Sequence, residues 1–337
     1  MRRRTSIELL ALAVTVVVLV VTGCVEEEGV TPEAAETAEV TPAAVAEAEV
    51  TPEATQAVGG TPETLEWTGV MPKAVLEWQL TMHEKHAHDP TWSPDGMKIA
   101  FTAGQLLPGN LDIWVIDSDG SNQRQLTTHR GSVGFPAWSP DGKMIAFTSD
   151  QAGNLAVWVM DSDGSNQRQL TTYEGGYSSW SPDGKMIAFC SSQAGNEDIW
   201  VMDSDGSNPR QLTTYQGPDY EPAWSPDGKR IAFTSEQAGN RDIWVIDSDG
   251  TNLGQLTTYQ GSDFEPTWSP DSKMIAFTSD QAGNEDIWVM DSNGGNREQL
   301  TMHTRGDFYP AWSPDGKRIA FTSLRTNKFD IWVLYLQ

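Results

Sequence analysis

The stretch Glu221–Thr257, EPAWSPDGKRIAFTSEQAGNRDIWVIDSDGTNLGQLT, contains four short apolar runs separated by turn sequences. Its SPDG segment fits a type I turn, because proline sets φ at the second position and glycine suits the last. Short β-rich runs bounded by Gly, Pro, Asn and Asp are typical of strands. The stretch therefore predicts four strands: 221–224, 229–235, 242–246 and one that begins at Gln255.

Copies of this stretch follow one another along the chain. Trp-Ser-Pro-Asp begins at six tryptophans spaced 46, 42, 44, 44 and 44 residues apart: Trp92, Trp138, Trp180, Trp224, Trp268 and Trp312. A second tryptophan series, in (D)IWV, stands at Trp114, Trp158, Trp200, Trp244, Trp288 and Trp332. Repeats of this length with four apolar segments are typical of propeller blades. We therefore expect an all-β fold, a six-bladed β-propeller.

The sixth repeat is incomplete, since after Asp330–Leu334 it lacks the turn and the fourth strand. The missing piece stands before the first repeat, where residues 77–83 (EWQLTMH) match the QLT segments of the complete repeats. We expect residues 77–83 to form the outer strand of the last blade. Closure of this kind removes an open sheet edge.

The segment DSDGSN and its variants begin at Asp117, Asp161, Asp203, Asp247 and Asp291. Two interpretations are open for them, a calcium loop and a hairpin turn. Carboxylates at alternate positions beside glycine resemble the start of a calcium loop. An EF-hand loop would need glycine at its sixth position and glutamate at its twelfth. Counted from Asp203, those positions hold Asn208 and Thr214. We therefore interpret the five copies as hairpin turns.

The first residues differ in composition from the repeats. Residues 1–23 combine three arginines with an apolar run from Leu9 to Val21, which is typical of an export signal. Val-Thr-Gly-Cys then predicts lipid attachment at Cys24, with an uncleaved anchor or plain secretion as alternatives. Residues 24–64 carry Thr-Pro every ten residues among Glu, Ala and Val, which predicts a disordered, extended stalk. The propeller domain is expected over 65–337.

The formal charge of −25 argues against nucleic-acid binding, which needs clustered Lys and Arg. It favours a self-repelling soluble surface, a cation-attracting face or a basic partner. If Cys24 is acylated, Cys190 is the one cysteine left, so no internal disulfide is expected. Cys190 stands where other repeats carry Thr, and we expect a small, half-buried strand residue rather than a reactive thiol.

The residues just before each first-strand tryptophan vary most and are expected at the mouth of the central channel. Their predicted binding residues are Asp89, Asp219, Glu221, Asp263, Glu265, Asp307, Tyr220, Phe264 and Phe308, with Phe135, Tyr177 and Tyr309 also interleaved. Such carboxylates could hold a cation, calcium included, or grip a basic peptide. The alternative is a solvated acidic funnel.

Two further patterns are interpreted as structural, without a role in metal binding or catalysis. His83, His86 and His88 form an HxxHxH cluster, but His83 aligns with Tyr or His of other repeats, so a metal site is not expected there. The aspartate of DIW recurs in every repeat except the second, where Ala156 replaces it: Asp112, Asp198, Asp242, Asp286 and Asp330. Catalysis does not come in five copies, so we expect hydrogen bonds within each blade.

The shared pattern, WSPDG-(K)-x-IAF-(T)-S followed by DIWVMD-x-DG-x-N-x-x-QLT, resembles the β-propeller repeats of TolB and related WD-like repeats over about 77–337. The resemblance implies a propeller that binds other proteins of the cell envelope. That family places an α/β domain before the propeller, where we expect a signal and a stalk. Propellers of dipeptidyl peptidases are similar too, but no Gly-x-Ser-x-Gly motif occurs here.

The sequence thus predicts a non-enzymatic scaffold for protein interactions. It is expected to be exported and lipid-anchored, facing the periplasm or the cell exterior, as a monomer without a cofactor. Its expected partners are envelope or surface proteins, reached while the lipid holds it to the membrane. The alternative is a propeller that binds a ligand, glycan or cation, or catalyses a reaction, at the channel mouth.

Overall fold

The computed structural model describes residues 73–82, 84–105, 110–129 and 131–337. The predicted signal, Cys24, the stalk and His83 lie outside the described residues. Among the described residues, no helix is long and apolar enough to cross a membrane.

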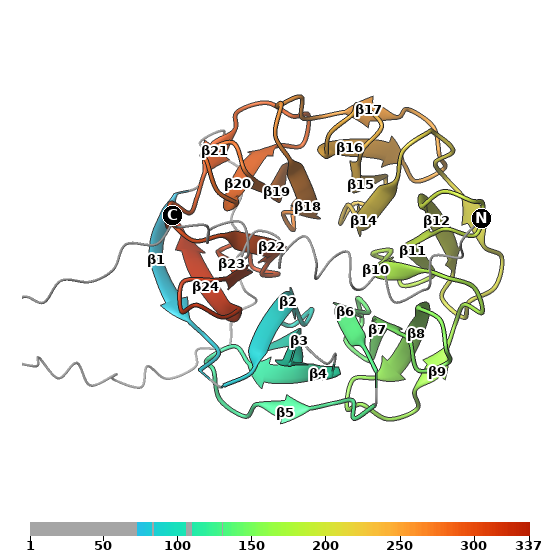
Figure 1. Cartoon of the computed structure of the whole chain (residues 1–337), viewed down its shortest axis with the longest axis horizontal. Helices are drawn as coiled ribbons and strands as arrows, with labels where there is room; N and C mark the ends of the chain where they lie inside the picture. The colour runs from blue at the N-terminus through green and yellow to red at the C-terminus, as the bar shows by residue number, and fades with distance from the viewer. Residues whose placement is uncertain (1–72, 83, 106–109, 130) are drawn as a thin grey trace, which may run out of the picture.

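The strands of the described chain form six four-stranded antiparallel sheets arranged around one axis (Figure 1). Blades 1 to 3 are β2 (His86–Trp92), β3 (Lys98–Gln105), β4 (Asn110–Asp117) and β5 (Arg124–Gln125); β6 (Val133–Trp138), β7 (Met144–Ser149), β8 (Ala156–Asp161) and β9 (Arg168–Gln169); β10 (Gly176–Trp180), β11 (Met186–Ser191), β12 (Asp198–Asp203) and β13 (Arg210–Gln211). Blades 4 to 6 are β14 (Asp219–Trp224), β15 (Arg230–Ser235), β16 (Asp242–Asp247) and β17 (Gly254–Gln255); β18 (Asp263–Trp268), β19 (Met274–Ser279), β20 (Asp286–Asp291) and β21 (Glu298–Gln299); β22 (Asp307–Trp312), β23 (Arg318–Ser323), β24 (Asp330–Leu336) and β1 (Ala74–Gln79). The six-bladed propeller is therefore confirmed.

Apolar side chains between neighbouring blades hold the ring together. The second strand of each blade places one phenylalanine at 0 or 1% exposure: Phe101, Phe147, Phe189, Phe233, Phe277 and Phe321. One core cluster joins Ile199 and Leu212 of blade 3 to Phe233 and Trp244 of blade 4. Burying one such side chain contributes about 2–3 kcal/mol, so the repeated IAF segment supplies a similar stabilisation at each interface.

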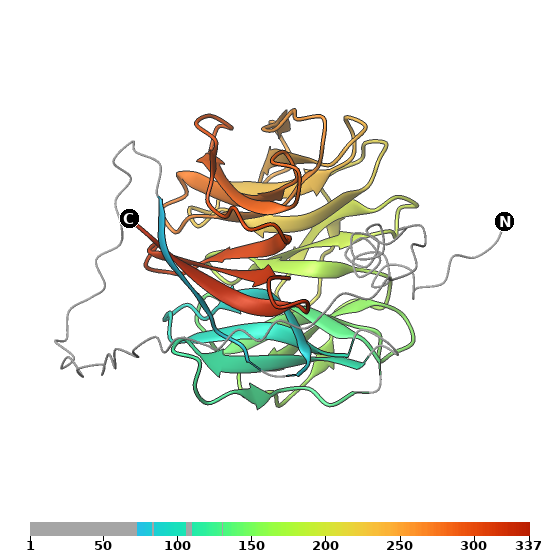
Figure 2. The same cartoon turned by 60° about the vertical axis from the view of Figure 1, so that its left-hand side comes forward.

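The ring closes through β1, which pairs antiparallel with β24 at the outer edge of the last blade (Figures 1 and 2). Gln79 lies opposite Trp332, and the Leu80 amide donates to the Ile331 carbonyl at 2.8 Å. Closure by the N-terminal segment is thus confirmed, but its bounds differ from the predicted 77–83. The strand begins at Ala74, because the backbone before the QLT motif also pairs along β24.

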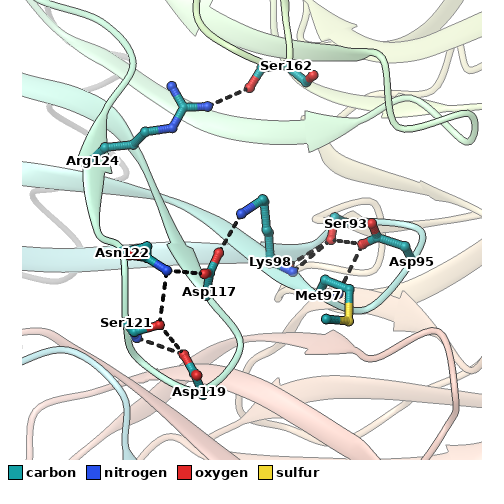
Figure 3. A network of polar contacts seen from close by, with 10 residues as sticks. All are labelled: Ser93, Asp95, Met97, Lys98, Asp117, Asp119, Ser121, Asn122, Arg124 and Ser162. Atoms are coloured by element: carbon teal, nitrogen blue, oxygen red, sulfur yellow. Dashed lines mark hydrogen bonds and ion pairs between the residues drawn. The ribbon is translucent and has the colours of Figure 1, made fainter. Parts of the chain in front are cut away.

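The SPDG and DSDGSN segments are turns held by their own polar groups (Figure 3). In the first hairpin, Asp119 Oδ1 accepts from the Ser121 amide and hydroxyl at 2.9 and 2.6 Å. Asn122 Nδ2 donates to Asp117 Oδ2 at 2.7 Å, while Arg124 reaches the Ser162 carbonyl of the next blade. The hairpin interpretation is confirmed, because the turn's own donors occupy these carboxylates.

The DIW aspartates make the hydrogen bonds expected within each blade. Asp112 accepts from the Thr127 hydroxyl at 2.9 Å and from the Gln125 amide at 2.8 Å, and Thr127 in turn accepts from the Ile113 amide. Where Ala156 replaces the aspartate, the Val157 amide still donates to Thr171 Oγ1 at 3.0 Å. The network fixes the short fourth strand to the third.

Candidate functional site

One residue in each innermost strand has a left-handed backbone conformation. It stands three positions before the first-strand tryptophan, with φ between 51 and 58°: Asp89, Phe135, Tyr177, Glu221, Glu265 and Tyr309. The register of each innermost strand shifts here, as between Tyr220 and Ala223. Bulges of this kind re-aim side chains, and a left-handed non-glycine residue costs about 1–3 kcal/mol. We call these six residues the inner ring.

Threonines of the neighbouring blade accept from the amides of four of the six inner-ring residues. The Phe135 amide donates to Thr102 Oγ1 and the Tyr177 amide to Thr148 Oγ1, both at 3.2 Å. The same contact joins Glu265 to Thr234 at 3.1 Å and Asp89 to Thr322 at 3.2 Å. Each bond links one blade to the next, so the inner ring is tied together around the axis.

A cavity of about 310 Å³, here called the axial cavity, lies against the inner ring. Its lining reaches Trp92 and Pro94, at the first SPDG turn, so it lies on the side of the ring that carries these turns. The lining contains all six inner-ring residues together with Pro90, Thr91, Trp92, Pro94, Pro136, Ala137, Trp138, Ser178, Ser179, Trp180, Pro222, Pro266, Thr267, Pro310 and Ala311. The closed ring therefore presents a concave site at one end of its axis.

Aromatic rings fill one part of the inner ring. The Phe135 ring lies 4.3 Å from that of Tyr177 and 6.2 Å from that of Tyr309, measured between centroids. Tyr309 belongs to blade 6, so Phe135 of blade 2 reaches beyond its neighbouring blade. Burial raises the pKa of both tyrosines well above the usual range, and these side chains stay neutral phenols.

Two glutamates from neighbouring blades face the same cavity. Glu221 Oε2 accepts from Thr234 Oγ1 at 2.7 Å and from the Glu265 amide at 3.0 Å. Glu265 Oε2 accepts from Thr278 Oγ1 and from the Tyr309 amide, both at 2.7 Å. Burial, and then the charge of Glu221, raises the pKa of Glu265 well above its usual range. Burial also raises the pKa of Glu221, which the hydrogen bond from Thr234 and the nearby charge of Arg241 oppose.

Asp89 is the third carboxylate of the axial cavity and is 6% exposed. Its Oδ2 accepts from Thr102 Oγ1 at 3.1 Å and contacts His88 Nδ1 at 2.8 Å, while its Oδ1 is buried without a hydrogen-bond partner. His86 Nδ1 accepts from the Phe329 amide. Across the described chain, no three His, Cys, Asp or Glu side chains are grouped as a metal site requires.

The structure brings three of the predicted site residues together and places six elsewhere. Asp89, Glu221 and Glu265 line the axial cavity, whereas Asp219, Asp263 and Asp307, two positions before the inner ring, are buried at 0 or 1% exposure and do not. Asp219 lies near Thr213 and Asp198 of the preceding blade, and burial raises its pKa to about 6. Asp307 pairs with Arg325. Asp219 thus belongs to the contacts between blades, and Asp307 to the contacts within the last blade.

The predicted aromatic residues Tyr220, Phe264 and Phe308 also lie outside the axial cavity. The Arg241 guanidinium lies 6.0 Å from the Tyr220 ring and 5.8 Å from the Phe264 ring, and Phe308 packs in one cluster with Phe264. The aromatic residues of the cavity are Phe135, Tyr177 and Tyr309, which the sequence also places among the residues of the channel mouth. The signal that finds them is their fixed spacing of three residues before Trp138, Trp180 and Trp312.

Blade 3 differs from the others beside Cys190. The connection into this blade is two residues shorter, and Gly175 and Gly176 line a small hollow together with Cys190 and Glu197. Cys190 is 3% exposed, more deeply buried than the half-buried position expected, and burial raises the pKa of its thiol well above the usual value. A thiol held protonated is a poor nucleophile.

Comparisons with known proteins agree with this fold. A family model described as the TolB beta propeller domain matches residues 174–253 and 222–337, and one described as the Tricorn protease N-terminal beta propeller domain matches residues 109–196. No curated protein matches the sequence.

Solved structures extend the likeness to most of the chain. A putative TolB from Agrobacterium tumefaciens is 25% identical with a TM-score of 0.61, over 79% of this chain and 99% of that one. TolB from Acinetobacter baumannii is 26% identical with a TM-score of 0.60, over 74% of this chain and 63% of that one, so this chain matches less than two thirds of its length. An oligogalacturonate lyase in complex with manganese, 16% identical over 77% of this chain and 93% of that one with a TM-score of 0.52, shares the fold alone. The repeats over residues 174–337 therefore match the TolB-type β-propellers, and the solved TolB structures share the fold of most of the chain.

Proposed function

We propose that this protein is an exported, lipid-anchored propeller that binds other proteins of the cell envelope and has no catalytic activity of its own. Export and anchoring rest on the sequence pattern of residues 1–24, which ends at Cys24. The protein-binding role is supported by the match of the repeats to the TolB-type propellers. The propeller acts as a monomer and faces the periplasm or the cell exterior.

The axial cavity is the feature that supports this role most directly. It is a concave site of about 310 Å³ with aromatic and acidic walls, at the end of the ring that carries the SPDG turns. Its walls come from all six innermost strands, which hydrogen bonds join from blade to blade. A binding site built on rigid elements loses little conformational entropy when a partner docks.

In-cell crosslinking tests the proposed role. The wild-type chain is compared with Thr91→Trp and Thr267→Trp, which place a large ring on the cavity wall, and with Ala152→Trp, an exposed position in the β7–β8 turn outside the cavity. We expect one and the same envelope protein to crosslink to the wild type and to Ala152→Trp, and to be lost with both cavity variants. Recovery of no envelope protein, or equal recovery with the cavity variants, would contradict the proposal.

Binding of a small ligand is the second candidate, because the cavity volume falls near the lower limit of about 300 Å³ for small-molecule sites. Thermal melting with mono- and oligosaccharides, with and without calcium, examines it. Stabilisation by a sugar that Thr267→Trp abolishes favours this candidate. Unchanged melting with every sugar removes the glycan version of it.

A further inference from the structure

The walls of the axial cavity carry two adjacent glutamates on one side and, on the other, three aromatic residues with Asp89 between two of them. In the order of the blades, the inner ring reads Asp89, Phe135, Tyr177, Glu221, Glu265 and Tyr309. The two glutamates come from adjacent blades, and a tyrosine follows on either side of the pair, Tyr177 before Glu221 and Tyr309 after Glu265. One occupant of the cavity can thus contact carboxylates and aromatic rings at once.

The carboxylates keep unused hydrogen-bonding capacity. Threonine hydroxyls and backbone amides bind Oε2 of Glu221 and of Glu265, and within the described chain no hydrogen bond reaches the Oε1 atom of either. Asp89 Oδ1 is buried and also has no partner. The Oε1 atoms of the two glutamates can therefore accept from a donor that enters the cavity, whereas the buried Asp89 Oδ1 is not open to the cavity.

Little positive charge balances these groups. No Lys or Arg stands among the described residues that line the cavity. Arg241 acts on the Glu221 charge, but its Nε donates to Glu236 Oε1 at 3.1 Å and its guanidinium lies by the Tyr220 and Phe264 rings, which are not part of the lining. When its carboxyls are ionised, the cavity therefore carries negative charge that no Lys or Arg of its own lining balances.

The dimensions of the cavity favour an organic cation over a metal ion. At about 30 Å³ per water molecule, 310 Å³ holds about ten waters. A bare metal ion would need several carboxylates grouped at coordination distance, and the described residues contain no such group. An ammonium or guanidinium group with part of its alkyl chain fills this space better.

We propose that the axial cavity binds an ammonium or guanidinium group, held by Glu221 and Glu265 on one side of the inner ring and by Phe135, Tyr177 and Tyr309, with Asp89 among them, on the other. The inference rests on the proposed function in that the cation is a lysine or arginine side chain of the bound partner. A free organic amine carries the same chemistry. Charge-assisted hydrogen bonds to the carboxylates and cation–π contacts with the rings supply the binding energy.

Calorimetric titration of the full chain tests the ligand chemistry. The probes are Nα-acetyl-lysine amide, Nα-acetyl-arginine amide and tetramethylammonium, with Nα-acetyl-glutamine amide as the uncharged match and the peptide acetyl-Gly-Gly-Lys-Gly-Gly-amide. We expect at least one cationic probe to bind at least tenfold more tightly than the glutamine amide. Tighter binding of the peptide than of the lysine amide assigns the cation to a protein partner, and equal binding assigns it to a free amine. Binding of the glutamine amide as tight as that of every cation would overturn the proposal.

Isosteric variants test the site. Glu221→Gln and Glu265→Gln keep an oxygen that can accept from Thr234 or Thr278 but remove the charge, and we expect each to weaken cation binding about tenfold or more. Glu84→Gln makes the same charge change at an exposed residue outside the cavity and is expected to bind like the wild type. Equal affinity of all three variants would refute the assignment. Thermal melting shows whether each variant is folded.

The pH dependence of binding tests the site in the wild-type protein, without any substitution. Burial raises the pKa of Glu221 and of Glu265, so their protonation is expected to lower the affinity for the lysine amide as the pH is lowered from 8 to 5. A pH-independent affinity would contradict the proposal. If Glu221→Gln and Glu265→Gln still crosslink the envelope partner as the wild type does, the assignment of the cation to the bound partner is refuted while the protein-binding role stands.

Discussion

Glu77 of β1 and Arg325 of the β23–β24 turn form an ion pair, although 248 positions separate them in the sequence. The same guanidinium donates to Asp307 Oδ2 at 2.7 Å and lies 4.9 Å from the Trp332 ring. Arg325 thus connects the N-terminal strand, the innermost strand and the third strand of the last blade.

Arg325→Ala is expected to destabilise the propeller by about 3 kcal/mol, because it leaves the Asp307 carboxylate, whose side chain is 0% exposed, without its counter-ion. Urea unfolding followed by tryptophan fluorescence measures the change. Arg305→Ala removes an exposed arginine nearby and is expected to leave the midpoint unchanged. Equal midpoints for the two variants would show that the ion pairs of Arg325 with Glu77 and Asp307 are not needed for stability.

Cys190→Thr is expected to stabilise the protein by about 1 kcal/mol. Cys190 occupies the position where other blades use a threonine hydroxyl to accept from an inner-ring amide, and the new hydroxyl would reach the amide of Glu221. The hollow beside Cys190 gives room for the added methyl group. Cys190→Val adds the methyl without the hydroxyl, so a gain of equal size with valine would rule out the hydrogen bond as its cause.

Acidification from pH 8 to 5 is expected to raise the stability of the propeller. Burial holds the pKa of Asp219 at about 6 and that of Glu197 at about 7 in the folded protein, while unfolded carboxyls titrate near pH 4. The folded state then binds more protons than the unfolded state between about pH 4 and 6 or 7. Stability therefore rises as the pH falls through this window and is lost as the pH rises again.

Urea midpoints across this pH range check the effect, and Asp219→Asn is expected to reduce the slope. Asp163→Asn is the matched control, because hydrogen bonds from Ser165 lower the pKa of Asp163 and its titration falls below the window. A slope that is the same in Asp219→Asn as in the wild type would contradict the assignment.

Gly164→Ala and Gly153→Ala form a matched pair within blade 2. Both glycines have left-handed backbones, with φ of 93 and 95°, so alanine is strained at either position by about 1–2 kcal/mol. At Gly164 the new Cβ would also lie 2.7 Å from the Leu126 carbonyl oxygen, whereas at Gly153 nothing lies within 4 Å. Thermal melting should show the larger loss for Gly164→Ala. Equal losses would mean that the hairpin moves freely against blade 1.

Cys24→Ser is expected to release the protein from the membrane fraction of the producing cell, since a diacyl chain at this residue supplies the proposed anchor. Immunoblotting of membrane and soluble fractions measures the shift, with Cys190→Ser as the control that keeps Cys24. Retention of Cys24→Ser on membranes would point to an uncleaved apolar segment instead.

The repeats made the blades predictable, because turn chemistry and apolar spacing are local and recur in register. Closure was predictable too, since residues 77–83 match a motif that the sixth repeat lacks. The start of β1 at Ala74 was not, because that backbone pairs through a ladder that needs no particular side chain. Asp219 and Glu221 show why the residues of the site could not all be predicted from the sequence. They are two residues apart in one strand, yet the bulge between Tyr220 and Ala223 separates their environments in a way that residue type does not show.

The first and last described residues of the ring, Lys73 and Gln337, exchange both backbone hydrogen bonds, at 3.2 and 3.0 Å. Tension applied through the segment before Lys73 therefore acts on this pair first. It would then peel β1 from β24 one hydrogen bond at a time, an unzipping geometry in which the bonds do not share the load. Under pulling from that side, the β1–β24 pair that closes the propeller is also the place where the ring would open mechanically.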